Sequence, residues 1–234
     1  MWETTVDGRK LTFHLAGINN QNFIMRDDET GSWWQQVSGE AIQGPLKGKK
    51  LKAVAHDELT FATWKREQPN GRVLQPDSKV SAEYEPGDWE ARYSRLRVVT
   101  GVDPSSPLPF RTLVVGIVQG YAARAYPFEQ LKRQSPILDT LGRVELVLVL
   151  GDDGRSVRAF RRKVDERVLE FFVRPEVKPL EMVDSETGTT WDFQGKAIRG
   201  ALVGKQLERI ELLEDYWFDW KTYHPQTSVF SQGR

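Results

Sequence analysis

One phrase occurs twice in this chain, and the repetition constrains the fold more than any other feature. ETGSWWQQVSGEAIQGPLKG (29–48) matches ETGTTWDFQGKAIRGALVG (186–204), and the flanking segments VDGRKLTF and FATWKREQP recur as VDERVLEF and WFDWKTYHP. The offset is 158 residues at Val6, 157 at Glu29 and 156 from Gly39 onward, so the match needs only single-residue gaps. Such self-similarity predicts two copies of one supersecondary unit.

Each copy is predicted to contain short strands followed by one helix. Asp7-Gly8 predicts a hairpin turn, because a type I′ turn needs positive φ at both central residues. The alternation of Leu11 and Leu15 with polar residues predicts a single strand over residues 9–15. Phe61 and Trp64, three residues apart, would share one face of a helix that Pro69 ends, and Trp217 and Trp220 repeat this pattern in the second copy.

The second copy is preceded by a segment that has no counterpart before the first. It predicts a hairpin about Gln119-Gly120, a short helix after Pro127, and a central strand at the apolar run Val144–Leu150. The first copy lacks these leading strands, so we expect a partner or a further segment to cover its sheet edge. The predicted fold is mainly β (α+β), with two pseudo-symmetric β-rich units and short helices. The first, incomplete unit covers residues 1–76, a connecting segment covers 77–111, the second unit covers 112–234, and all are expected to pack as one domain.

Composition narrows the classes of partner. Lys+Arg and Asp+Glu both number 33, and no long run of one sign occurs, which is not the charge pattern of a nucleic-acid binder. The chain has no cysteine, so thiol chemistry and cysteine-based metal sites are excluded for these residues. The longest apolar run, Val144–Leu150, is too short to span a bilayer. A soluble chain without a transmembrane segment is expected, cytoplasmic if the sequence is complete.

Three stretches together resemble the bacterial and archaeal domain-of-unknown-function family 3179: AGINNQNFIMRDDETGSWWQQVSGEAIQGPLKG, DELTFATWKREQPNGRVL and GYAARAYPFEQL. The resemblance implies no established activity. It does imply an exported or membrane-anchored protein with a cysteine-containing stretch, similar in some relatives to a selenocysteine site, just before the VDGR hairpin. That stretch would lie before Met1, so the resemblance favours a fragment, which would then be exported or membrane-anchored, over a complete chain.

Polar residues found in only one copy are the best candidates for a functional site, because shared positions serve the fold of the unit. His14, Gln36 and His56 correspond to Phe172, Phe193 and Leu212 in the second copy. Amides beside aromatic faces can hold neutral polar ligands. Asn-rich segments are also typical of turns, and Trp34, shared with Trp191, is predicted to be core. The predicted ligand-binding residues are His14, Asn19, Asn20, Asn22, Trp33, Gln35, Gln36, Glu40 and His56.

Three functions are compatible with these residues. The first is a binding or accessory module for a small polar ligand, and the second is an oxidoreductase whose cysteine or selenocysteine segment lies upstream. The third is metal binding by His14 and His56, with Glu40 or Asp57, although no metal-ligand spacing motif is present. For the binding module, no catalytic residue, cofactor or metal ligand is assigned. The acidic pairs Asp27-Asp28 and Asp152-Asp153 are expected to be solvated turn residues.

Overall fold

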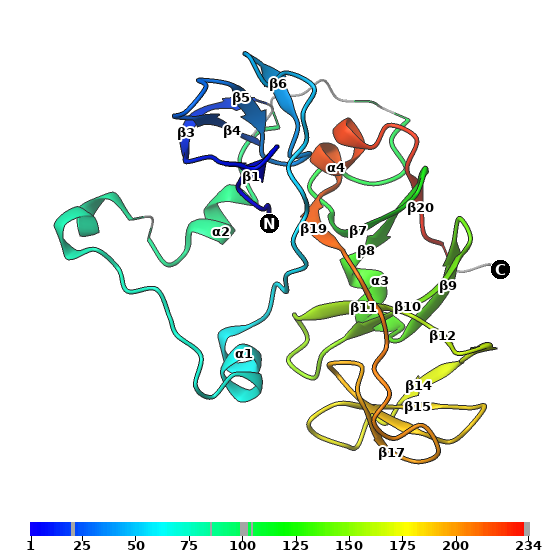
Figure 1. Cartoon of the computed structure of the whole chain (residues 1–234). Coiled ribbons are helices and arrows are strands. Elements are labelled where there is room, and N and C mark those ends of the chain that lie inside the picture. Colours follow the sequence, from blue (N-terminus) through cyan, green and yellow to red (C-terminus); the bar gives the residue numbers. More distant parts are fainter. Residues whose placement is uncertain (20–21, 85, 99–102, 104, 232–234) are drawn as a thin grey trace.

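Strands are the main regular secondary structure in the computed structural model, which describes residues 1–19, 22–84, 86–98, 103 and 105–231. They form several antiparallel sheets with few, short helices, so the predicted mainly β fold class is confirmed. Figure 1 shows the first unit in blue, the sheet of β7 and β8 beside α4, and the sheet of β14 to β17 at the far end of the chain's second half.

The first unit consists of a hairpin and a four-stranded sheet. Asp7 and Gly8 turn the chain with φ of 49° and 78°, as predicted for a type I′ turn. The single strand predicted over residues 9–15 is wrong, because the Thr12 N–H donates to Glu29 Oε2 (2.8 Å) and interrupts the ladder. The hairpin strands are β1 (Thr5–Val6) and β2 (Arg9–Lys10), and the sheet order is β3 (Phe13–Asn19), β4 (Asn22–Asp27), β5 (Trp33–Gln35), β6 (Ala41–Gln43).

The matched phrase of the second copy forms a sheet with the same strand order. The antiparallel bridge between Trp2 and Ala53 corresponds to the pairing of Phe160 with Arg209, at the offsets given above. These two pairings therefore occupy equivalent positions in the two copies. That the two units arose by duplication stays a prediction. The second hairpin is β12 (Lys163–Val164) and β13 (Arg167–Val168), and its sheet is β14 (Phe171–Val173), β15 (Glu181–Asp184), β16 (Thr190–Asp192), β17 (Ala197–Arg199).

Two further sheets combine the segment before the second copy with strands of the second copy itself. The hairpin about Gln119-Gly120 and the central strand at Val144–Leu150 are both observed as predicted. The central strand is buried because apolar clusters cover both of its faces, one with Leu146 and Leu148 and the other with Val147 and Val149. One sheet has the order β19 (Leu213–Tyr216), β7 (Leu113–Gln119), β8 (Ala122–Pro127), β20 (Ser228–Val229). The other has the order β18 (Arg209–Ile210), β11 (Val157–Arg161), β10 (Val144–Leu150), β9 (Ile137–Leu141).

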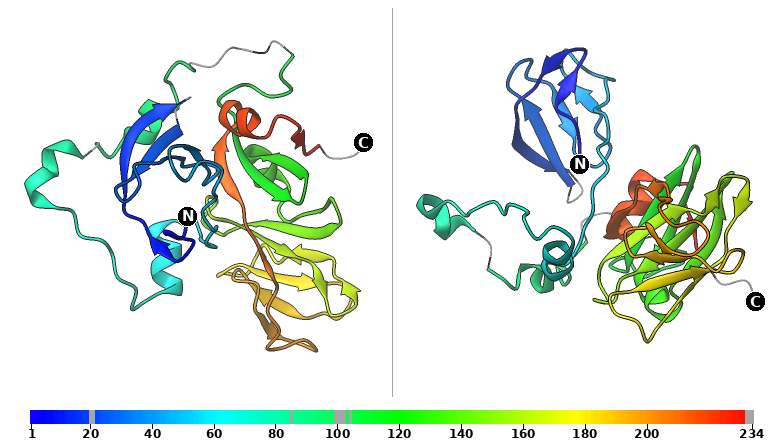
Figure 2. Two further views of the ribbon diagram at one scale, coloured as in Figure 1. Left: turned by 45° about the horizontal axis from the view of Figure 1, so that its top comes forward. Right: turned by 60° about the horizontal axis from the view of Figure 1, so that its bottom comes forward.

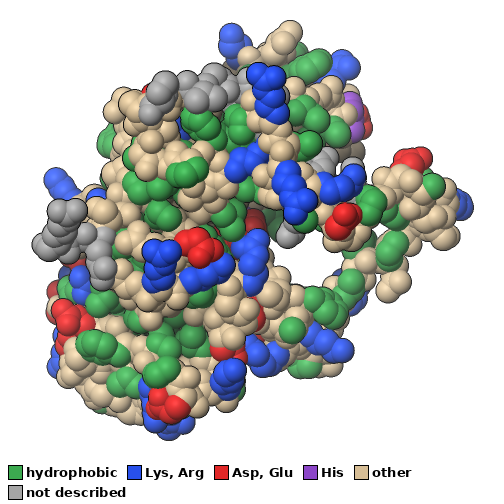
Figure 3. Space-filling model, turned by 180° about the vertical axis from the view of Figure 1, so that it is seen from behind, with side chains coloured by type: hydrophobic (Ala, Val, Ile, Leu, Met, Phe, Trp, Pro, Cys, Tyr) green, Lys and Arg blue, Asp and Glu red, His purple; other side chains and the backbone are tan. Residues whose placement is uncertain are grey.

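The helices are short and begin where the sequence indicates. Helix α1 (Phe61–Glu67) has Thr60 as its N-cap and ends before Pro69, and α4 (Trp217–Tyr223) is its equivalent in the second copy. The other helices are α3 (Phe128–Arg133), α2 (Trp89–Tyr93) and the 3-10 helix η1 (Ser78–Glu83). In the space-filling view the segment with η1 and α2 stands away from the body of the molecule (Figure 3).

Segment 57–67 ties the first unit to the second half of the chain. The Arg158 guanidinium, 3% exposed, donates to Glu67 (2.7 Å) and to Asp57 (2.8 Å). Asp153 is an exposed turn residue, as expected, and it also accepts hydrogen bonds from the hydroxyls of Thr60 (2.6 Å) and Thr63 (2.7 Å). Figure 2 shows the blue sheet joined to the rest of the chain by the irregular stretch that leads into this segment.

A buried aspartate anchors the turn of each matched sheet. Asp27 was expected to be solvated, yet it is 0% exposed and accepts hydrogen bonds from Trp34 Nε1 (2.8 Å) and the Thr30 hydroxyl (2.9 Å). Asp184 accepts the corresponding bond from Trp191 Nε1 (2.8 Å). The expectation failed because the ETG turn directs this carboxylate inward, where it satisfies the indole N–H of the core tryptophan. Trp34 itself is fully buried, as predicted.

Replacing Asp27 by asparagine should destabilise the protein much more than the same change at Asp28. The amide side chain would keep the shape but lose the charge that several donors share, so we expect the free energy of unfolding at pH 7 to fall by about 2–3 kcal/mol. Asp28 is exposed and pairs with the exposed His14, so Asp28→Asn should cost less than about 1 kcal/mol. Urea denaturation of both variants provides the measurement, and equal losses would contradict the anchoring role.

The same pair of variants tests pH dependence. Burial alone would raise the pKa of Asp27, but hydrogen bonds from Trp34 and Thr30 outweigh it, so this pKa lies below its ordinary value. A depressed carboxyl pKa stabilises the folded state above the unfolded pKa of about 3.9, and the contribution is lost as the pH falls through the folded pKa. The stability gap between wild type and Asp27→Asn should therefore narrow as the pH falls below about 4.

Candidate functional site

A cleft of ≈ 760 Å³ opens between the first unit and the layer formed by β7, β19 and α4. One wall carries Asn22, Gln35 and Glu40 from the first sheet and its loops, and the other carries Asp215 and Asp219 from β19 and α4. The volume suits a small molecule, and the polar residues converge from segments far apart in the sequence.

The structure brings five of the nine predicted site residues to this cleft: Asn22, Gln35, Gln36, Glu40 and His56. His14 and Trp33 do not line it. His14 lies on β3 and its Nδ1 is 2.9 Å from Asp28, whereas half-buried Trp33 precedes the core residue Trp34, and adjacent strand residues point to opposite faces. Asn19 ends β3 opposite Asn22, and Asn20 lies outside the described residues.

Asp219 is a buried acid at the floor of the cleft. Asp219 is only 7% exposed. Its Oδ2 accepts a hydrogen bond from Asn22 Nδ2, which belongs to the opposite wall. The other oxygen, Oδ1, is buried and receives no hydrogen bond from any described N–H group. A buried acceptor without a donor costs free energy, which marks this atom as a place for a ligand or a proton.

Close packing of α4 on β7 fixes the direction of Asp219. Trp220, 2% exposed, lies so close over Gly116 that a Cβ at position 116 would overlap its ring. The Trp220 indole N–H donates to the Thr227 hydroxyl (2.9 Å), and its ring contacts the His224 ring with centroids 4.0 Å apart. These contacts fix the position of α4 on the sheet. Asp219 and Tyr223 are four residues apart, so they lie on the same face of the helix, which is turned toward the cleft.

Asp215 and Asp219 form a coupled carboxyl pair. Burial, followed by the charge of Asp219, raises the pKa of Asp215 to about 8. Burial also raises the pKa of Asp219 to about 6, although the hydrogen bond from Asn22 acts in the opposite direction. No lysine or arginine among the described residues pairs with either acid. At pH 7 the pair therefore holds about one proton, which the two groups share.

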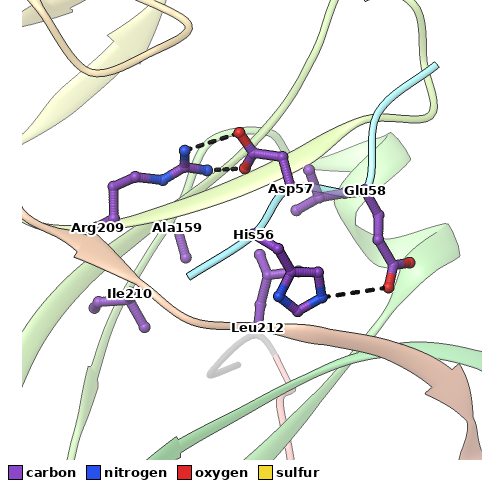
Figure 4. Close-up of a pocket in the computed structure, with 8 residues that line it drawn as sticks. His56, Asp57, Glu58, Ala159, Arg209, Ile210 and Leu212 are labelled. Atoms are coloured by element: carbon purple, nitrogen blue, oxygen red, sulfur yellow. Dashed lines mark hydrogen bonds and ion pairs between the residues drawn. The ribbon is translucent and has the colours of Figure 1, made fainter. Parts of the chain in front are cut away.

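The segment that enters α1 forms a third part of the wall, shown in Figure 4. Asp57 is clamped by both terminal nitrogens of Arg209, one at 2.8 Å from Oδ2, and His56 Nε2 lies 3.9 Å from Glu58. These residues line a hollow of ≈ 10 Å³ that shares His56, Glu58 and Leu212 with the large cleft. The Asp57–Arg209 pair thus holds His56 and Glu58 at the rim of the cleft.

The metal hypothesis for His14 and His56 gains no support from this geometry. Each histidine has its own carboxylate neighbour, Asp28 for His14 and Glu58 for His56. Within the described part of the chain, no group of three or more His, Cys, Asp or Glu residues could hold a metal ion.

Sequence reasoning missed Asp215, Asp219 and Tyr223, although a signal for the two acids exists. At the offset of 156 residues, Asp215 corresponds to Leu59 and Asp219 to Thr63. Asp215 is therefore a polar group unique to one copy, and Asp219 is an acid where the first copy has a neutral threonine, but such positions were sought only in the first copy. The acids also stand in an aromatic run, EDYWFDW, where burial of a carboxylate is unusual.

The structure is that of a β-rich protein with a cleft between two sheet layers. The sequence model of the family described as "Protein of unknown function (DUF3179)" matches residues 1–227, so the chain belongs to this family and the resemblance is confirmed. No curated protein and no solved structure matches the chain. Among the described helices, none has the length and apolar character needed to cross a membrane.

Asp215→Asn should change how stability depends on pH. A carboxyl with a raised folded pKa binds more protons in the folded state, so wild-type stability falls as the pH rises from about 4 toward the folded pKa of about 8. Asparagine removes this penalty, and we expect Asp215→Asn to gain on the order of 2 kcal/mol relative to wild type between pH 5 and pH 8.

Chemical denaturation at the two pH values measures this gain. The matched control is Glu166→Gln, which removes an exposed carboxylate from the turn between β12 and β13 and should show no such trend. A stability difference between Asp215→Asn and wild type that is constant with pH would contradict the raised pKa.

Proposed function

We propose that this protein binds a small polar ligand in the cleft between its first sheet and the layer of β7, β19 and α4. The observation that carries the proposal is the buried Asp219 carboxylate, which lines the cleft with one oxygen bonded to Asn22 and the other without an N–H donor. A native fold keeps such an atom where a ligand completes its hydrogen bonding.

Further lining groups supply directional hydrogen bonds and apolar surface. Gln35, whose Oε1 accepts from the Ser38 hydroxyl at 2.7 Å, and Tyr223 come from the two walls and are hydrogen-bonded to each other, so one molecule beside them could contact both. The Trp2 indole is fixed by a hydrogen bond to the Gln36 carbonyl (2.7 Å), which presents its ring to the cleft. Aromatic rings and amides in one cavity are typical of sites for small polar molecules with a carbon skeleton.

Binding, rather than a redox reaction, is the function that these residues support. The sequence has no cysteine, so a thiol step would need a sulfur atom that none of these residues supplies. The coupled Asp215–Asp219 pair could exchange a proton with a bound molecule, but no described nucleophile stands beside it with a base in a triad-like arrangement. We therefore propose recognition without assigning a reaction.

A thermal-shift panel of sugars, polyols, amino acids and amines tests this proposal. A compound that fills the cleft at one hundred times its Kd should stabilise the protein by about 2.7 kcal/mol, or roughly 5–10 °C in Tm. Tyr223→Phe, which removes one hydroxyl from the cleft wall, should reduce the shift for that compound. The matched control Tyr121→Phe changes a fully exposed residue in the turn between β7 and β8 and should leave it unchanged. A panel without any stabilising compound, or equal shifts in both variants, would contradict binding at this cleft.

A further inference from the structure

The charges around the cleft indicate the chemical class of its ligand. We propose that the cleft takes a linear organic cation, and that one ammonium group of this molecule docks on the carboxyl pair of Asp215 and Asp219. This inference rests on the proposed binding function and specifies its ligand.

Acidic residues dominate the lining of the cleft, although the chain as a whole has no net charge. Among the described residues that line the cleft, six are acids and Lys50 is the one lysine or arginine. One acid, Glu214, is already paired with Arg155. The six acids are Glu40, Glu58, Glu211, Glu214, Asp215 and Asp219. A concave surface of one sign concentrates ligands of the opposite sign.

The carboxyl pair lacks the counter-ion that several other partly buried acids of this chain possess. Asp57 and Glu67 lie against Arg158 and Arg209, and Asp139 lies against Arg124. Asp215 and Asp219 instead face each other, and a shared proton takes the place of a cation. A buried carboxylate pair without a counter-charge is costly, so a ligand that brings positive charge and N–H donors would gain by replacing the proton.

An ammonium group matches the unsatisfied acceptor of this pair. Its three N–H donors can reach Asp219 Oδ1 and the Asp215 carboxyl together, and Asn22 already occupies Asp219 Oδ2. A metal ion is disfavoured by the donor set, because no described group of three or more potential ligands is arranged to hold one. The rings of Trp2, Trp220 and Tyr223 add aromatic surface for a carbon chain and for cation–π contact.

The groups that face the pair determine how binding should respond to pH. Glu58 lies on the side of the first unit, and burial together with the charges of Asp219 and Asp215 raises the pKa of Tyr223. Burial, and then Lys50, lowers the pKa of His224, so this imidazole favours its neutral form. His56 and Glu214 complete the set of titratable neighbours. Because the ammonium competes with the shared proton, affinity should rise from pH 5.5 to pH 8.

Isothermal titration with two probes of the same length tests this assignment: the diamine putrescine and its uncharged counterpart butanediol. We expect putrescine to bind the wild type, with an affinity at least tenfold lower at pH 5.5 than at pH 8, and we expect no binding of butanediol. Asp219→Asn should lower putrescine affinity at pH 8 by at least tenfold and flatten its pH dependence. Glu166→Gln, with the same loss of one negative charge on an exposed turn, should bind as the wild type does.

The outcomes separate this inference from the function on which it rests. If butanediol or other neutral compounds of the panel bind the cleft as well as putrescine does, the cation assignment is overturned and ligand binding stands. If no compound binds, both proposals fail. Should Asp219→Asn prove unfolded, Asp215→Asn provides the second variant, and unchanged putrescine affinity in a folded variant of either residue overturns docking on the pair.

Discussion

The arrangement of the whole chain depends on one buried guanidinium. Arg158 on β11 binds Asp57 and Glu67, which stand at either end of the segment that leads out of the first unit and through α1. A buried ion pair stabilises little by itself, but an uncompensated charge at this place would be strongly unfavourable. The ion pairs of Arg158 therefore fix a single orientation of the first unit relative to the second half of the chain. The cleft exists because this docking leaves the first sheet facing α4 across a space.

Buried aspartates serve two opposed purposes in this protein, and their neighbours decide which. Asp27 and Asp184 accept hydrogen bonds from tryptophan and threonine donors within the same turn, so their charge is satisfied locally and they anchor the sheets. Asp215 and Asp219 face each other across the entrance of α4, and their charge is balanced by a proton. The first arrangement stabilises a fold unit, whereas the second places a carboxyl pair at the cleft that becomes more negative when it loses its proton.

The two cores differ in size, which explains why the cleft forms beside the first unit. In the second half, Val147, Val149 and Phe160 from the central sheet pack against the Trp191 side of its unit. The first unit has a small cluster around Trp34 and no such layer among the described residues. One face of its sheet region is therefore free to approach β19 and α4 through polar contacts such as Asn22 to Asp219. A few polar contacts leave room for a ligand beside them, whereas a packed apolar layer would not.

The sequence by itself determined the local elements: the type I′ turn at Asp7-Gly8, the helix that Pro69 ends, the central strand at Val144–Leu150 and the core position of Trp34. These follow from φ preferences, ring geometry and apolar periodicity, which act over a few residues. It also indicated five residues of one cleft wall, since polar positions unique to one copy are visible without coordinates. Only the tertiary structure decided that Asp215, Asp219 and Tyr223 form the opposite wall, and that His14 and Trp33 face elsewhere. The reason is that the docking of the two halves is set by ion pairs such as Arg158 with Glu67, which join residues 91 apart, and no local pattern encodes such a contact.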